Sequence, residues 1–232
     1  MRQINTFSDK RLDNMCSYCG DFPDTRDHVP SRILLDEPFP ENLPVVPCCD
    51  KCNQGFSLDE EYFACAIECI IQGTTEIEFL NRQKIKSILS KKENLKKRIE
   101  SSFVVENENK YFKIDLPRFE NAITKLAKGH LKFENSEPQF ENPTSIAFKS
   151  IFDMDENEEE AFFTPTVFDK APEVGSRGLQ NLLIGHNQEI LSHWTIVQEG
   201  TYQYMVSVSS GVEIVRILIW NYLAIEVIWR NQ

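Results

Sequence analysis

The stretches Cys16-Ser-Tyr-Cys19 and Cys49-Asp-Lys-Cys52 decide the fold of the amino-terminal part of this chain. Each is a Cys-x2-Cys pair, and a chain with this cysteine content would contain only about 0.2 such pairs by chance. Four thiolates match the tetrahedral coordination of structural zinc, whose binding supplies on the order of 10 kcal/mol of folding free energy to a module with little core. The spacing therefore predicts one zinc site formed by all four cysteines.

The other three cysteines lack this spacing. Cys48 adjoins Cys49 but has no second cysteine three positions away. Its thiol could compete with that of Cys49 for the metal. Cys65 and Cys69 lie four residues apart in an apolar segment, where small buried side chains are the favoured interpretation. A redox role for one Cys-x2-Cys pair is a weaker alternative, because neither pair stands at a strand-to-helix start in a βαβ pattern.

Composition limits the class of protein. The chain has 232 residues, a length that suits one large domain or a small module plus a larger one. Its hydrophobic fraction of 41% indicates a globular protein. The mean hydropathy is −0.37, no secretory signal opens the chain, and charged residues interrupt its longest apolar run, at 212–229. We expect a cytoplasmic protein with no membrane association. The net charge of −11 excludes a protein that coats nucleic acid through bulk positive charge.

Hydrophobic periodicity predicts an α+β fold with four regions. A zinc-bound module is expected at 1–73, ending in a helix at about 58–72 that a Ser57-x-x-Glu60 capping box begins. Region 74–133 should contain a basic helix at 80–100, a hairpin at 103–114 and a helix at 118–131. Region 134–160 resembles an acidic loop or linker, and region 161–232 should be mostly β, ending in an antiparallel meander from Trp194 onward. A helix at 212–229 is the alternative for the last strands.

Between and just after the Cys-x2-Cys pairs stand Asp27-His28-Val29-Pro30, Asn42-Leu43 and Asn53. With the cysteines, this order resembles the HNH, or ββα-metal, endonucleases that carry a zinc on four cysteines. The resemblance covers about residues 14–63. It implies a β-hairpin that bears Asp27 and His28, followed by a helix that presents Asn53. It also implies that Asn42 helps to hold the hairpin and orient the catalytic base.

The same residues suit phosphodiester hydrolysis on chemical grounds. A histidine with a pKa near ~6.5 is largely neutral at pH 7, so His28 is the candidate general base that takes a proton from water. Asp27 and Asn53 offer hard oxygen ligands for one Mg²⁺ or Mn²⁺, which would stabilise the leaving oxygen. The zinc would then be structural and the catalytic ion separate.

Candidate phosphate-binding residues fall in two places. Arg26, Arg32 and Lys51 lie within the motif region, where acidic residues nevertheless outnumber basic ones. Further along, the segment from Arg82 to Arg98 has eight basic residues and one acidic residue, and its candidates are Lys84, Lys91, Lys92 and Lys96. An ordinary solvated charged face is an equally good interpretation of this segment.

The sequence thus favours a metal-dependent HNH endonuclease (a hydrolase) that cleaves DNA, with RNA not excluded. Resemblance suggests a bacterial restriction or antiviral (anti-phage) defence role, and the acidic net charge suits a companion protein that supplies recognition. A homodimer is compatible with the aromatic carboxyl-terminal strands. The alternative is a noncatalytic four-cysteine zinc module that binds nucleic acid or a protein partner.

Overall fold

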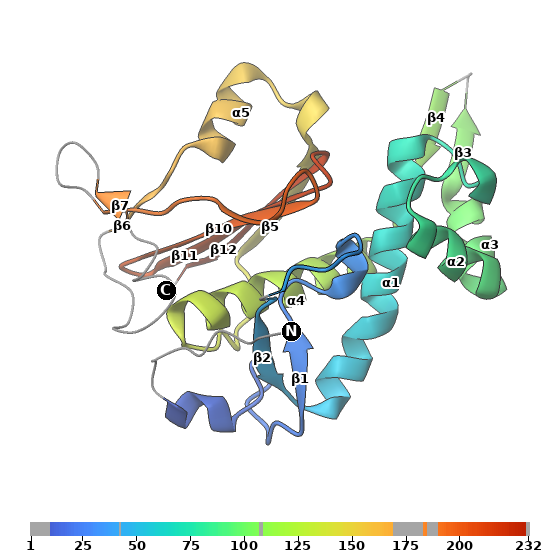
Figure 1. Cartoon of the computed structure of the whole chain (residues 1–232). Helices are drawn as coiled ribbons and strands as arrows, with labels where there is room; N and C mark the ends of the chain where they lie inside the picture. The colour runs from blue at the N-terminus through green and yellow to red at the C-terminus, as the bar shows by residue number, and fades with distance from the viewer. Residues whose placement is uncertain (1–9, 42, 107–108, 169–182, 185–189, 231–232) are drawn as a thin grey trace. The chain divides into compact units, whose positions relative to one another are not determined.

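The computed structural model describes residues 10–41, 43–106, 109–168, 183–184 and 190–230 (Figure 1). The helices of these residues are α1 (Asp50–Gln72), α2 (Gln83–Lys91), α3 (Glu93–Ser102), α4 (Leu116–Asn135) and α5 (Glu156–Phe163). Short 3-10 turns are η1 (Lys10–Asn14), η2 (Arg32–Leu34), η3 (Ile77–Phe79) and η4 (Ile151–Asp153). The strands are β1 (Thr25–His28), β2 (Val45–Cys48), β3 (Phe103–Glu106), β4 (Asn109–Phe112), β5 (Ser145–Ser150), β6 (Val167–Phe168), β7 (Leu183–Ile184), β8 (Ile190–Leu191), β9 (Thr195–Gln198), β10 (Tyr202–Ser209), β11 (Val212–Ile219) and β12 (Leu223–Arg230). The expected mixture of helices and strands is confirmed.

The chain forms two compact units. The first comprises residues 1–53 and 123–232, and the second comprises residues 54–122. The sequence suggested regions that end at residues 73, 133 and 160. That division stays a prediction, and in the structure the amino-terminal hairpin and the carboxyl-terminal sheet belong to the same compact unit.

A β-hairpin leads into the first helix. Strands β1 and β2 pair antiparallel, with Thr25 opposite Cys48 and His28 opposite Val45. Helix α1 begins at Asp50, whose backbone N–H donates to Oδ1 of Asp24 at 2.6 Å. The predicted capping box at Ser57 is wrong, because Asp24 satisfies an orphan amide seven residues earlier and the helix has already formed by Ser57.

The carboxyl-terminal strands form the predicted antiparallel meander. The sheet order is β5-β12-β11-β10-β9, and residues 212–230 are two strands joined by a turn at Trp220 and Asn221, both of which have positive φ. The expectation of a loop at 134–160 is wrong for residues 145–150. These residues form the edge strand β5, which pairs with β12 from Ser145 to Ser150, and the segment also contains η4 and most of α5.

Helix α4, in its part from Ile123 onward, lies between the β1–β2 hairpin and the five-stranded sheet (Figure 1). Towards the sheet, His130 stacks on Tyr204 with ring centroids 3.8 Å apart. Towards the hairpin, the backbone of Gly129 comes so close that an added Cβ would meet Val29 Cγ2 at 2.9 Å. A helix enclosed on both sides explains why Lys125, Lys128 and Lys132 are all buried.

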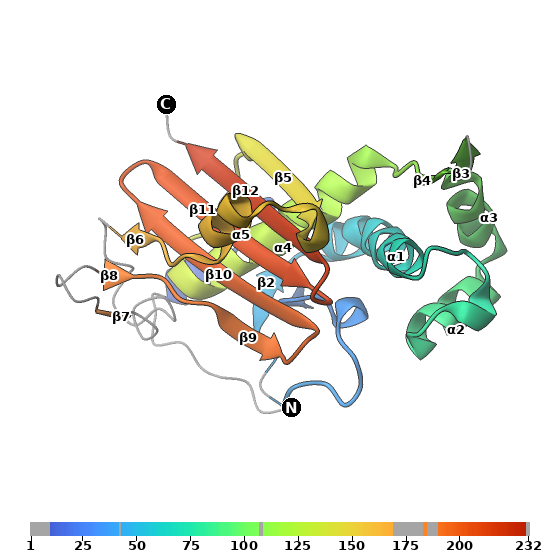
Figure 2. The same cartoon turned by 90° about the horizontal axis from the view of Figure 1, so that it is seen from above.

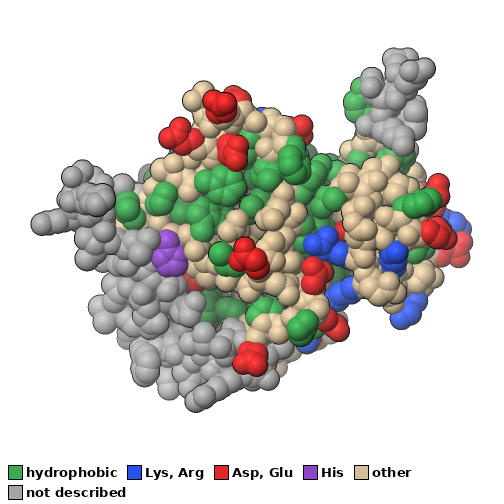
Figure 3. All heavy atoms as spheres, turned by 45° about the horizontal axis from the view of Figure 1, so that its top comes forward, with side chains coloured by type: hydrophobic (Ala, Val, Ile, Leu, Met, Phe, Trp, Pro, Cys, Tyr) green, Lys and Arg blue, Asp and Glu red, His purple; other side chains and the backbone are tan. Residues whose placement is uncertain are grey.

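Helix α5 covers part of the opposite face of the sheet (Figure 2). Phe162 of α5 forms a small buried cluster with Leu218 of β11 and Ala224 of β12. Apolar side chains gather around this layer, next to the acidic side chains of α5 (Figure 3). The sheet therefore has apolar contacts on both faces, which explains the near-continuous apolar sequence of its central strands.

The second unit has its own core and its own hairpin. Phe119 packs edge-on against Phe63, with ring centroids 4.8 Å apart. The helix expected at 80–100 is two helices, because Lys92 has φ −114° and ψ 76° and ends α2 before α3 starts. Strands β3 and β4 pair as predicted, from Phe103 opposite Phe112 to Glu106 opposite Asn109.

Candidate metal centre

The four cysteines of the two Cys-x2-Cys pairs meet in the structure. The Sγ atoms of Cys16, Cys19, Cys49 and Cys52 all lie within 4.8 Å of one another, and those of Cys19 and Cys49 are 3.7 Å apart. Tetrahedral zinc with bonds of about 2.3 Å requires sulfurs about 3.8 Å apart. The predicted cluster is confirmed as a four-cysteine group compatible with a metal such as zinc.

Local backbone geometry builds this cluster from both pairs. The N–H groups of Tyr18 and Cys52 point at the sulfurs of Cys16 and Cys49, at 3.5 Å and 3.4 Å. Gly20 follows the first pair with φ +81°, a conformation that side chains with a Cβ rarely adopt, and its N–H donates to the carbonyl of Cys16. The first pair is therefore a tight turn and the second spans the start of α1, and in both a backbone amide points at a cysteine sulfur.

The remaining cysteines stand outside the cluster of four. Cys48, Cys65 and Cys69 are fully buried. Burial raises the pKa of each thiol, to about 12 for Cys69. These cysteines are inert apolar residues under ordinary conditions, as the sequence suggested for Cys65 and Cys69.

Asp27 lies on β1 and is buried, with 7% of its surface exposed. Its Oδ2 accepts a hydrogen bond from the Tyr18 hydroxyl at 2.6 Å. The same oxygen forms an ion pair with Lys125 Nζ at 2.7 Å, and that ammonium also donates to Ser31 Oγ at 2.7 Å. The carboxylate is therefore held by two side chains that the sequence did not single out. Lys125 lies 98 positions further along the chain, in a helix whose period marked only its apolar face.

His28 follows Asp27 and is half-buried. Burial lowers its pKa below the ordinary histidine value, the positive charges of Arg32 and Lys125 lower it further, and the negative charge of Asp27 opposes them. The imidazole is therefore mostly neutral at pH 7, which is the state a general base needs.

Asn53 lies in the first turn of α1, and its Nδ2 donates to Thr25 Oγ1 at 3.2 Å. Thr25 and Asp27 are two positions apart on one strand and so share one face of the hairpin. The structure thus brings Asn53 to the strand that bears Asp27 and His28. The convergence of these three side chains on one ion stays a prediction, and Asn42 lies outside the described residues.

The basic candidates near the hairpin are exposed. Arg26, Arg32 and Lys51 all reach the surface, and Arg32 lies over the ring of Phe39 at 5.9 Å. In the second unit, carboxylates offset part of the positive charge of the 82–98 segment. Lys92 pairs with Glu61 at 2.7 Å and Lys96 with Glu100 at 3.5 Å. Lys84 is half-buried and Lys91 is exposed, and both stay candidate phosphate-binding residues. The pairing of Lys92 and Lys96 leaves less net positive charge around them than the sequence indicated.

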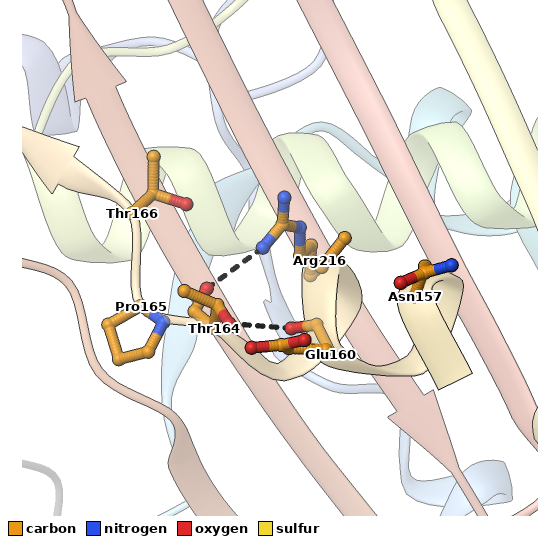
Figure 4. A pocket seen from close by; sticks show the side chains of 7 residues that line it. Asn157, Glu160, Thr164, Pro165, Thr166 and Arg216 are labelled. Carbon is orange, nitrogen blue, oxygen red and sulfur yellow. Dashed lines mark hydrogen bonds between the residues drawn. The ribbon is translucent and has the colours of Figure 1, made fainter.

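The first unit also has a surface pocket away from the cysteine cluster, between α5 and β11. Figure 4 shows Glu160 and Thr164 at the end of α5 beside Arg216 of β11. The guanidinium donates to Glu226 at 2.7 Å and to the carbonyls of Phe162 and Thr164. Because these bonds fix the arginine to its own fold, the pocket is best explained as a seam between α5 and the sheet.

No protein-family model, curated protein or solved structure matches this chain. The resemblance to the HNH endonucleases therefore rests on the order of the motifs in the sequence. Among the described residues, no helix is both long enough and apolar enough to span a membrane.

The four-cysteine cluster fits zinc, and a second, hard cation at Asp27 and Asn53 stays a prediction. Four thiolates suit zinc, and the carboxylate of Asp27 with the amide oxygen of Asn53 suits a hard divalent cation. The two contacts of Asp27 described above both fall on Oδ2, which makes Oδ1 the oxygen to offer to such a cation.

Proposed function

We propose that this chain is a metal-dependent phosphodiester hydrolase of the HNH type that cleaves DNA. The observation that carries the proposal is the order β1-β2-α1 around the four-cysteine cluster, with Asp27 and His28 on β1 and Asn53 tied to Thr25. A cluster of cysteines alone would support only a binding module. A neutral histidine and a carboxylate on the same strand would add the groups that hydrolysis requires.

Each residue then has one task. His28 accepts a proton from the attacking water, since its pKa is lowered and the ring is neutral at pH 7. Asp27 and Asn53 hold Mg²⁺ or Mn²⁺, which supplies positive charge at the leaving oxygen. Arg26, Arg32 and Lys51 are exposed cations that contact backbone phosphates. The four cysteines hold structural zinc and keep the hairpin against the start of α1.

The net charge of −11 suits an enzyme that does not hold DNA by itself. The proposal therefore includes a companion protein that recognises the DNA target, in a bacterial restriction or anti-phage system. The cationic helix α2 would add phosphate contacts through Lys84 and Lys91.

One observation favours a second candidate, the noncatalytic zinc module. Asp27 is buried and already paired with Lys125, as expected for a structural ion pair inside a folded core. In that case the module would present a binding surface for nucleic acid or protein, and His28 would have no chemical role.

The His28→Ala variant separates the two candidates. His28 is half-buried and the notable ion pair at Asp27 does not involve it, so the variant should keep its fold and zinc content. We expect at least a hundredfold loss of Mg²⁺-dependent cleavage of plasmid DNA, the lower range for loss of a general base. Arg26→Ala is the matched control on the same strand and should lose far less. If wild-type protein with Mg²⁺ or Mn²⁺ cuts neither DNA nor RNA, with or without its companion, the binding module is the correct assignment.

A further inference from the structure

The ammonium of Lys125 occupies a position in which a metal ion could otherwise balance Asp27. It lies 2.7 Å from Asp27 Oδ2 and 2.7 Å from Ser31 Oγ, and the side chain is 2% exposed. The Tyr18 hydroxyl completes the set on the same carboxylate oxygen at 2.6 Å. An internal cation thus neutralises the carboxylate when no metal is bound.

Lys125 is held in this place by the packing of α4. Four residues further along, Gly129 lets the helix backbone approach Val29 and the hydroxyl of Tyr18. At the next position, His130 contacts Tyr202 and Tyr204 in the sheet. With contacts on both sides, α4 has little freedom to withdraw the ammonium from the hairpin.

We propose that Lys125 is a positioning residue that competes with the divalent ion for Asp27 and so weakens metal binding at the proposed site. The inference rests on the proposed function. A cation on Oδ1 would lie within a few ångströms of the ammonium on Oδ2, in a site with little water to screen the repulsion. The same contact fixes the orientation of the carboxylate, so the site is ordered before a metal arrives but binds it loosely. Substrate phosphate, as an additional anionic ligand, then strengthens metal binding only when nucleic acid is present.

The test measures Mn²⁺ binding by electron paramagnetic resonance on the zinc-loaded full chain, without substrate. Lys125→Met removes the charge and keeps most of the side-chain volume. We expect its Kd for Mn²⁺ to fall at least tenfold relative to wild type, and the Mn²⁺ concentration for half-maximal DNA cleavage to fall with it. Ser31→Ala loosens the ammonium without removing it, so a smaller decrease of twofold to fivefold is expected.

Lys132→Met is the matched control. Lys132 is another buried lysine of α4, but its ammonium donates to the carbonyl of Ser136 and pairs with Asp13. This variant should bind Mn²⁺ within twofold of wild type. A purely structural role for Lys125 would affect both lysine variants alike, through stability alone.

The outcomes are distinguishable. If wild type binds Mn²⁺ in a manner that Asp27→Asn abolishes, but Lys125→Met binds it equally or more weakly, the competition is disproved and the hydrolase proposal stands. If neither wild type nor any variant shows Asp27-dependent Mn²⁺ binding or cleavage, both proposals fail. Should Lys125→Met not fold, Ser31→Ala decides, and an unchanged Kd there overturns the inference.

Discussion

Asp27 has a structural role in the described structure besides the chemical role that we propose for it. Its carboxylate is buried against the ammonium of Lys125, so removal of either partner leaves an uncompensated charge in the interior. Activity loss in an Asp27 variant therefore does not by itself assign a metal ligand. The stability of such a variant has to be measured alongside its activity, a need that follows from the ion pair and not from the sequence motif.

We expect Asp27→Ala to lower the free energy of unfolding by about 3–5 kcal/mol, because it strands the ammonium of Lys125. The double variant Asp27→Ala/Lys125→Met should recover much of this loss. Urea denaturation of the zinc-loaded protein measures both. The exposed pair of Lys149 and Glu158 is the control, and Glu158→Gln should lower stability far less than Asp27→Ala does. A single Asp27→Ala variant as stable as wild type would show that the buried pair contributes nothing.

His130 makes stability depend on pH. Its ring is fully buried, and this burial, together with the smaller effect of the positive charge of Lys125, lowers its pKa to about 3. Below a pH of about 6.5 the unfolded chain binds a proton at this residue that the folded chain does not, so stability falls as the pH falls. His130→Gln should reduce this slope by up to about 1.4 kcal/mol per pH unit between pH 6 and 4.5. Urea denaturation at several pH values measures the slope, and equal slopes for both proteins would contradict the assignment.

At the scale of elements, α4 is the part that organises the first unit, and Gly129 allows its close approach to the hairpin. Glycine in a helix normally costs stability relative to alanine, by about 1 kcal/mol. We expect the reverse here: Gly129→Ala should destabilise by about 1–3 kcal/mol, because its Cβ would lie 2.9 Å from Val29 Cγ2. Gly55 in α1 has nothing within 4 Å of such a Cβ, so Gly55→Ala should be neutral or stabilising. Thermal melting of the two variants is the measurement, and a stabilised Gly129→Ala would refute the close approach.

Elements with a strong local signal were predictable from the sequence, and those set by distant partners were not. The alternation in Tyr202–Ser209 and the turn at residues 209–211 predict the β10–β11 hairpin by themselves. Strand β5 is only six residues long and follows an acidic, loop-like stretch, and it becomes a strand because β12 offers it an edge. The start of α1 depends on Asp24, which lies 26 residues before Asp50 and outside any local capping pattern.

The same distinction applies to the candidate site across the whole molecule. The four cysteines were predictable because zinc ligands occur at recognisable spacings in sequence, and because tetrahedral coordination requires two such pairs to meet. Lys125 was not, since its link to Asp27 exists only after α4 packs on the hairpin. Tyr18 was not either, since its hydroxyl reaches Asp27 only when the first Cys-x2-Cys turn has folded against β1. A buried lysine in a helix resembles a surface lysine until the tertiary partner is known.

The hairpin and the carboxyl-terminal sheet should unfold as one body when the metal is removed. The indole N–H of Trp220, between β11 and β12, donates to the carbonyl of Leu34 at 3.0 Å. The side chain of Gln198 on β9 exchanges two hydrogen bonds with the backbone of Asp36, each 2.9 Å long.

We therefore expect chelation of zinc, or Cys19→Ser, to increase hydrogen exchange in β10, β11 and β12 as well as in β1 and β2. Hydrogen-exchange mass spectrometry with and without the chelator measures this directly. Cys69→Ser, which changes a cysteine outside the cluster, controls for the loss of a thiol and should leave the metal content unchanged. Protection that persists in β11 and β12 after the metal has left would mean that the sheet folds independently of the hairpin. In that case the contacts of Trp220 and Gln198 join two separately stable parts.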